Sequence, residues 1–126
     1  MVVVDSDVII WMLRGDKEVS ELFKKTVVGY DGNVFVTPVQ MAEIIAGMLP
    51  REKTKVEEFF EAIGLFTIGE KAGRLAGEFM NKYGKSHNVT MADALIAAVT
   101  RLNGCLLWTR NKKYYPMLRA DGFYQE

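Results

Sequence analysis

The sequence predicts an α/β fold, in which a small parallel sheet is covered by helices on both faces. Short β-branched apolar runs, such as residues 2–4 and 34–36, alternate with longer segments whose apolar residues recur at helical spacing. Alternation of this kind is typical of parallel strands joined by helical crossovers. There is no internal repeat, linker or low-complexity stretch, so residues 1–126 are expected to form one domain.

In the N-terminal half, the three valines at 2–4 predict a strand buried on both faces. The apolar segment 8–13 follows and ends at Arg14-Gly15, and 16–28 reads as an amphipathic helix. After the strand at 34–36, Thr37-Pro38-Val39-Gln40 has the order of a capping box. This motif predicts a helix that runs to about residue 49.

In the C-terminal half, apolar periodicity predicts helices over 52–63 and 70–83, separated by a strand at 64–69 that glycines bracket. A second capping signature, Thr90-Met91-Ala92-Asp93, opens a helix that extends to about residue 103. A buried strand is expected at 105–108, followed by polar residues at 109–113. We expect the tail from residue 114 to hold a short helical turn and a last edge strand near Phe123.

Composition excludes some classes of site. Sixteen basic and sixteen acidic residues cancel, so net charge argues neither for nor against nucleic acid. One cysteine and one histidine cannot build a zinc site of the Cys/His type within a single chain. Cys105 lies in an apolar run and is expected to be a buried, inert thiol. Without a long apolar span or a basic leader, the expected location is the cytoplasm.

Three isolated carboxylates carry the functional signal. Asp5 closes the first strand, Glu43 is the one charged residue of 37–49, and Asp93 is the one charged residue of 89–100. Acidic side chains are rarely buried without a partner, and neither helical stretch contains Lys or Arg. Ligands of parallel α/β sheets bind beyond the carboxyl ends of the strands. We therefore predict a shared Mg²⁺ or Mn²⁺, the usual centre for phosphodiester hydrolysis.

Each of these acids also has a simpler interpretation. Asp5 is in position to act only as the N-cap of the helix that begins near Asp7. Asp93 stands at the third helical position after Thr90, so it also fits the acid of a capping box. Glu43 has no cap role, and its alternative is an exposed position on an otherwise buried helix.

A basic segment indicates the substrate. Residues 94–120 contain five basic side chains and no acidic one, with aromatic residues between them. Arg110, Lys112 and Lys113 directly follow a strand, so they are expected at the same sheet edge as the carboxylates. Such a rim suits an RNA backbone and stacked bases, although an ordinary solvated loop has the same composition.

Four segments match a known family: VVDSDVII at 3–10, AEIIAG at 42–47, MADALIAA at 91–98 and LWTRNKKYYP at 107–116. Because these segments occur in the family's order and spacing, the chain resembles the PIN-domain ribonucleases, and in particular the VapC toxins of prokaryotic toxin–antitoxin pairs. The resemblance implies a PIN-like α/β/α sandwich with a parallel sheet of four to five strands. It also implies metal-dependent hydrolysis of RNA, a homodimer, and a small antitoxin whose C-terminal segment covers the active-site groove.

By the same resemblance, Asp5, Glu43 and Asp93 are the catalytic, metal-binding acids. Asn111 falls where many relatives carry a fourth acid, so it is expected to be a weaker metal ligand with a neutral oxygen. Ser6 and Thr109 match polar positions that hold the carboxylates in place. Asp7 is expected to favour the N-terminus of its helix and to lie beside the ligands.

Two other functions remain open from the sequence. A strand that ends in Asp-x-Asp also opens phosphatases of the haloacid-dehalogenase type, with Asp5 as nucleophile and Asp7 as acid/base. Such enzymes need a late acidic pair, and Thr109-Arg110-Asn111 has none. The second alternative is a catalytically weak PIN-like domain that binds RNA or a protein, which the neutral Asn111 favours.

Overall fold

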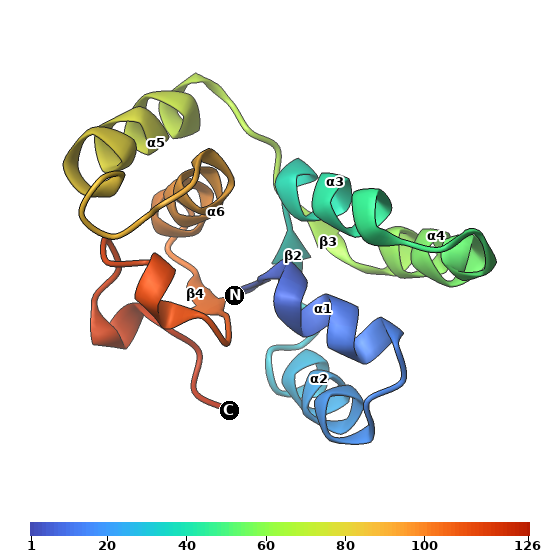
Figure 1. Ribbon diagram of the computed structural model, residues 1–126. Helices are drawn as coiled ribbons and strands as arrows, with labels where there is room; N and C mark the ends of the chain where they lie inside the picture. The colour runs from blue at the N-terminus through green and yellow to red at the C-terminus, as the bar shows by residue number, and fades with distance from the viewer.

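The computed structural model describes residues 1–126, and its centre is a four-stranded parallel sheet in the order β3-β2-β1-β4 (Figure 1). The strands are β1 (Val2–Val4), β2 (Val34–Val36), β3 (Gly64–Leu65) and β4 (Leu106–Trp108). All three ladders are parallel, which confirms the predicted sheet. No helix has the length and apolar character that crossing a membrane requires.

Six helices connect and cover these strands, close to the predicted positions. They are α1 (Ser6–Leu13), α2 (Lys17–Gly29), α3 (Pro38–Gly47), α4 (Lys53–Ala62), α5 (Glu70–Tyr83) and α6 (Met91–Leu102). Short 3₁₀ turns follow α3 at Pro50–Glu52 and β4 at Lys112–Tyr114, and a third lies at Ala120–Gly122. Both predicted capping boxes are present, at Thr37 and at Thr90.

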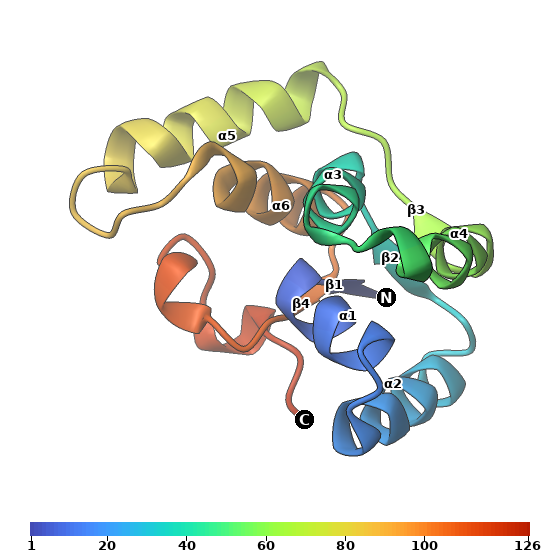
Figure 2. The same cartoon turned by 45° about the vertical axis from the view of Figure 1, so that its right-hand side comes forward.

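The valines of β1 alternate between two cores because successive side chains of a strand point to opposite faces. Val3 packs with Leu107 against α5 and α6, which lie together on one side of the sheet (Figures 1 and 2). Val2 and Val4 pack with Trp108 against the other face, where α1, α2 and α4 contribute Val8, Ile9, Val19, Phe23 and Val56. Both faces of β1 are therefore buried, as its uninterrupted valine run predicted.

Two predicted strands are shorter than expected. The strand predicted at 64–69 pairs only over Gly64–Leu65, and one further backbone bond joins Phe66 N to Val36 O at 2.9 Å. At Gly64 a Cβ would lie 2.5 Å from the Phe35 ring, so β3 approaches β2 too closely for any larger residue. The chain then leaves the sheet edge toward α5. The edge strand expected near Phe123 is a single bridge to Leu107.

The strand order reverses beside β1. From β1 the chain moves outward through β2 to β3, and it then returns so that β4 lies on the opposite side of β1. In open α/β sheets, ligands bind at the carboxyl ends of the strands where the strand order reverses, which here is between β1 and β4. Asp5 directly follows β1 and Thr109 directly follows β4, so both residues stand at this point.

Candidate metal and RNA site

Backbone contacts on both sides fix the position of Asp5. Its backbone N–H donates to the Trp108 carbonyl of β4 at 2.8 Å. On the other side, the β1–β2 ladder has its last pair at Val3. Beyond that pair, the fully buried side chain of Gln40 bonds to the end of β1 in place of β2. The Gln40 Nε2 donates to the Val4 carbonyl at 3.0 Å, while its Oε1 accepts from the Thr37 backbone at 3.0 Å. The capping box of α3 therefore also holds the end of β1.

The Asp5 carboxylate is buried, with 7% of the residue exposed, and accepts three hydrogen bonds. Oδ1 accepts from the Ser6 backbone N–H at 2.8 Å, and Oδ2 accepts from Thr109 Oγ1 at 2.8 Å and from the Tyr115 hydroxyl at 2.9 Å. Burial, and then repulsion by Asp7, raises the pKa of Asp5 to about 6, although the hydrogen bonds partly offset this. None of the four ion pairs in the protein involves Asp5.

Glu43 reaches the site from α3. Its side chain is at the surface, and its Oε1 accepts from Ser6 Oγ at 2.9 Å. Partial desolvation raises the pKa of Glu43, and the negative charges of Asp93 and Asp7 raise it further. Like charges influence one another in this way only when they lie near each other. The carboxylates of Asp7 on α1 and Asp93 on α6 are therefore near enough to act on Glu43 of α3.

Asp93 caps α6, which was the simpler interpretation of this residue. Its Oδ2 accepts from the Thr90 backbone at 3.2 Å and from Thr90 Oγ1 at 2.9 Å. Asp5 also caps a helix, since its bond from the Ser6 N–H lies at the start of α1. Both cap roles are thus real. In its cap position, the Asp93 charge still acts on Glu43 and on the Tyr115 hydroxyl.

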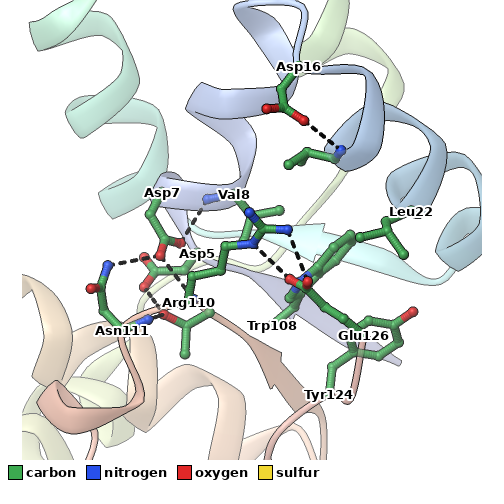
Figure 3. A network of polar contacts seen from close by, with 12 residues as sticks. Asp5, Asp7, Val8, Asp16, Leu22, Trp108, Arg110, Asn111, Tyr124 and Glu126 are labelled. Atoms are coloured by element: carbon green, nitrogen blue, oxygen red, sulfur yellow. Dashed lines mark hydrogen bonds and ion pairs between the residues drawn. The ribbon is translucent and has the colours of Figure 1, made fainter.

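Asp7 has a larger role than the helix N-terminal acid that the sequence predicted. Its Oδ1 accepts from the Val8 N–H at 2.7 Å, and its Oδ2 accepts from the Arg110 N–H at 3.0 Å and from Asn111 Nδ2 at 2.9 Å (Figure 3). These bonds tie the start of α1 to the loop that follows β4. Burial raises the pKa of Asp7, as it does for Asp5.

The donor set suits a hard divalent cation, although the side chains do not form a finished cage. No three His, Cys, Asp or Glu side chains are arranged around a common point. Each of the four predicted ligands nevertheless keeps an oxygen with an open acceptor position: Glu43 Oε2, Asp93 Oδ1 and Asn111 Oδ1 accept no protein hydrogen bond, and Asp5 Oδ1 accepts one. Oxygen donors of this kind fit Mg²⁺ or Mn²⁺ once Glu43 and Asp93 turn toward Asp5.

The three basic residues predicted to bind RNA differ in availability. The Arg110 guanidinium donates to both carboxylate oxygens of Glu126, at 2.9 and 3.0 Å, and Glu126 also accepts from Trp108 Nε1 at 2.8 Å (Figure 3). Arg110 is therefore already paired, which the sequence did not predict. Lys112 and Lys113 are exposed and have no acidic partner, and their ammonium groups lie over aromatic rings at 5.4 and 5.1 Å.

Sequence reasoning missed two residues that contact this site. Tyr115 was noticed only as an aromatic residue in a basic segment, yet its hydroxyl donates to Asp5. Gln40 was recognised as a cap, and nothing in the motif indicated that its amide would reach β1. Ser6 and Thr109 do contact the carboxylates that they were expected to hold, at Glu43 and Asp5 respectively.

Comparison with known proteins identifies the family. The family model described as the PIN domain matches residues 2–118. Ribonuclease VapC10 of Mycobacterium tuberculosis is 33% identical over 118 residues, which cover 93% of this chain and 87% of that protein. These matches confirm the resemblance that the sequence motifs carried.

Solved structures with the same fold come from toxin–antitoxin complexes. The complex from Klebsiella pneumoniae contains a chain with a TM-score of 0.79 and 15% identity, over 99% of this chain and 97% of that one. VapBC2 of Rickettsia felis, bound to a promoter DNA fragment, gives a TM-score of 0.77 at 12% identity, over 100% and 98%. Since the family model covers almost the whole chain, the protein belongs to the PIN-domain family and is a relative of the VapC ribonucleases.

Proposed function

We propose that this protein is a Mg²⁺- or Mn²⁺-dependent endoribonuclease that acts in the cytoplasm as the toxin of a toxin–antitoxin pair. The observation that carries the proposal is the group of acids at the carboxyl ends of β1 and β4, none of which has a basic partner. Membership of the PIN-domain family and the name of the ribonuclease relative support the same activity.

In this proposal, Asp5, Glu43 and Asp93 hold the cation, and Asn111 adds a weaker, neutral oxygen. A bound divalent cation polarises a phosphoryl oxygen and lowers the pKa of water, which is what phosphodiester hydrolysis requires. The chain itself orients the ligands. Ser6 holds Glu43 through its hydroxyl, and Thr109 holds Asp5. Because the Asp5 pKa is about 6, its carboxylate is mostly ionised at neutral pH and available to a cation.

The RNA backbone is proposed to bind along the loop after β4. Lys112 and Lys113 are the free cations there, and they lie on the turn that directly follows Thr109 to Asn111. Arg110 can bind a phosphate only in exchange for Glu126, because its guanidinium already makes two bonds to that carboxylate. The two lysines therefore supply the first electrostatic contact with the RNA backbone. Arg110 supplies a further contact once its guanidinium leaves Glu126.

An antitoxin is the proposed protein partner, as in the complexes that share this fold. The chain offers an apolar groove between α1, α3 and α4, lined mainly by Ile10, Leu13, Ile44, Met48 and Val56. Exposed apolar side chains near it include Trp11, Ile45 and Leu49. An apolar segment of an antitoxin would cover this surface. A homodimer stays a prediction that the size of the purified protein in solution tests.

The phosphatase alternative is wrong because the chain belongs to the PIN-domain family. Its required acid/base, Asp7, is held instead by Val8, Arg110 and Asn111. A domain that binds RNA without cutting it is the alternative that experiment must separate from the proposed nuclease, since Asn111 contributes no charge.

The test is cleavage of purified tRNA, rRNA and mRNA with Mn²⁺ or with EDTA, by wild type, Asp93→Asn and Asp16→Asn. Asp16 is the control, because its carboxylate also serves a helix N-terminus, as the N-cap of α2, whereas Asp93 is the third residue of α6 in a capping box with Thr90. Asp16 is not among the charges that act on Asp5 or Glu43. We expect cleavage with Mn²⁺ by wild type and Asp16→Asn, and none with EDTA or with Asp93→Asn. RNA binding without cleavage by the wild-type protein would support the non-cutting alternative instead.

A further inference from the structure

The Tyr115 hydroxyl is a buried polar group that serves the site from a distant part of the chain. The residue is 1% exposed, and its ring packs among side chains of the core that α5 and α6 cover. Its hydroxyl donates to Asp5 Oδ2 at 2.9 Å and has no other partner in the structure. A phenol is protonated at neutral pH, so this group acts there as a constant donor.

The two carboxylate oxygens of Asp5 differ in the number of hydrogen bonds that they accept. A carboxylate oxygen can accept about two hydrogen bonds. Oδ2 accepts from both Thr109 and Tyr115, whereas Oδ1 accepts only from the Ser6 N–H. Thr109 Oγ1 itself accepts from the Asn111 N–H at 3.1 Å, which directs the hydroxyl proton to Asp5. Oδ2 is therefore fully used, and the open acceptor position is at Oδ1.

We propose that Tyr115 is a positioning residue, whose hydroxyl works with that of Thr109 to fill Asp5 Oδ2 and thereby presents Oδ1 to the cation. The inference rests on the proposed function and adds to it a residue that touches neither cation nor RNA. Without the phenol, one position on Oδ2 opens and the carboxylate loses one of the three donors that fix its rotation. Outer partners of metal ligands commonly act in this way.

Tyr115→Phe tests the inference, with Tyr114→Phe as the matched control. Both changes delete one phenolic hydroxyl from adjacent residues, and the Tyr114 hydroxyl contacts no acid. Titration calorimetry should show a dissociation constant for Mn²⁺ raised about tenfold in Tyr115→Phe. At a fixed Mn²⁺ concentration kcat should fall while the KM for RNA stays the same, since the phenol is buried against Asp5 and is not exposed to RNA. Tyr114→Phe should match the wild type in all three quantities.

Urea unfolding separates positioning from a merely structural role. The change in midpoint that Mn²⁺ causes is measured within each variant, so a general loss of stability does not affect it. A smaller Mn²⁺-induced change in Tyr115→Phe than in Tyr114→Phe supports the inference. Equal changes, in a wild type that binds Mn²⁺ and cleaves RNA, overturn this inference alone. A wild type that binds no Mn²⁺ overturns the proposed function together with it.

Discussion

Without a metal, the protein should lose stability as the pH rises through the titration of Asp5. The pKa of this carboxyl is 3.8 when unperturbed and about 6 in the folded protein, because the group is buried near Asp7. At about 1.4 kcal/mol for each pKa unit, ionised Asp5 lowers the free energy of unfolding by about 3 kcal/mol relative to an unperturbed carboxylate. The folded state binds more protons than the unfolded state between these two values. The stabilisation that protonated Asp5 provides relative to the ionised form is therefore fully present below pH 3.8 and is lost as the pH rises through about 6.

Urea unfolding in EDTA at about pH 4.5 and about pH 7.5 measures this loss. About 2 of the 3 kcal/mol should disappear between these two pH values. The remainder is already lost at about pH 4.5, because the Asp5 carboxyl of the unfolded chain is largely ionised there. Asp7 and Glu43, whose pKa values are also raised, add changes of the same sign. Comparison with Asp5→Asn isolates the contribution of Asp5, because the other two acids remain. Parallel pH dependences in wild type and Asp5→Asn would refute the assignment of this cost to Asp5.

Three further predictions concern the surroundings of the site. Gln40→Ala leaves the buried Val4 carbonyl of β1 and the buried Thr37 N–H before α3 without partners, so the free energy of unfolding should fall by about 2 to 4 kcal/mol in urea titrations. Glu126→Gln weakens the bidentate pair with Arg110 and should lower the KM for RNA; the pair is about one-third exposed, so stability should change by less than about 1 kcal/mol. Lys112→Ala with Lys113→Ala should raise the KM and flatten its salt dependence, while Lys25→Ala on α2 should change neither.

The contradicting results are equally specific. An unchanged unfolding free energy in Gln40→Ala would mean that water replaces the amide at the end of β1. A higher KM in Glu126→Gln would mean that the carboxylate holds Arg110 in a productive position and does not compete with phosphate. A salt dependence that survives the double lysine change would place the RNA on another surface.

Local sequence patterns predicted the elements because each rests on neighbouring residues. Thr37 and Gln40 stand three residues apart and form the capping box that their spacing indicates. The valines of β1 are buried on both faces, as an uninterrupted apolar run predicts. The predicted length of β3 was wrong because the pairing depends on how far β2 runs beside it on another part of the chain, and no local pattern records that partner.

Contacts between distant parts of the chain explain what the sequence did not show. The Tyr115 hydroxyl and Asp5 are 110 residues apart, and Asn111 and Asp7 are 104 apart. Both contacts exist because β4 returns to the side of β1, a feature of strand order and not of local spacing. The charges of Asp93 and Asp7 act on Glu43, and the charge of Asp7 acts on Asp5. The cap roles of Asp5 and Asp93 followed from local spacing, whereas the Arg110–Glu126 pair needed the full structure.

Titration calorimetry of Mn²⁺ into the metal-free protein near neutral pH tests most directly whether these acids share a cation. Wild type, Asp93→Asn and Asp16→Asn should be compared, because both variants replace a carboxylate at a helix N-terminus by an amide and only Asp93 belongs to the proposed site. We predict saturable Mn²⁺ binding by wild type and Asp16→Asn, and loss of binding in Asp93→Asn. Equal Mn²⁺ binding by all three proteins, or by none of them, would contradict a metal site built on Asp5, Glu43 and Asp93.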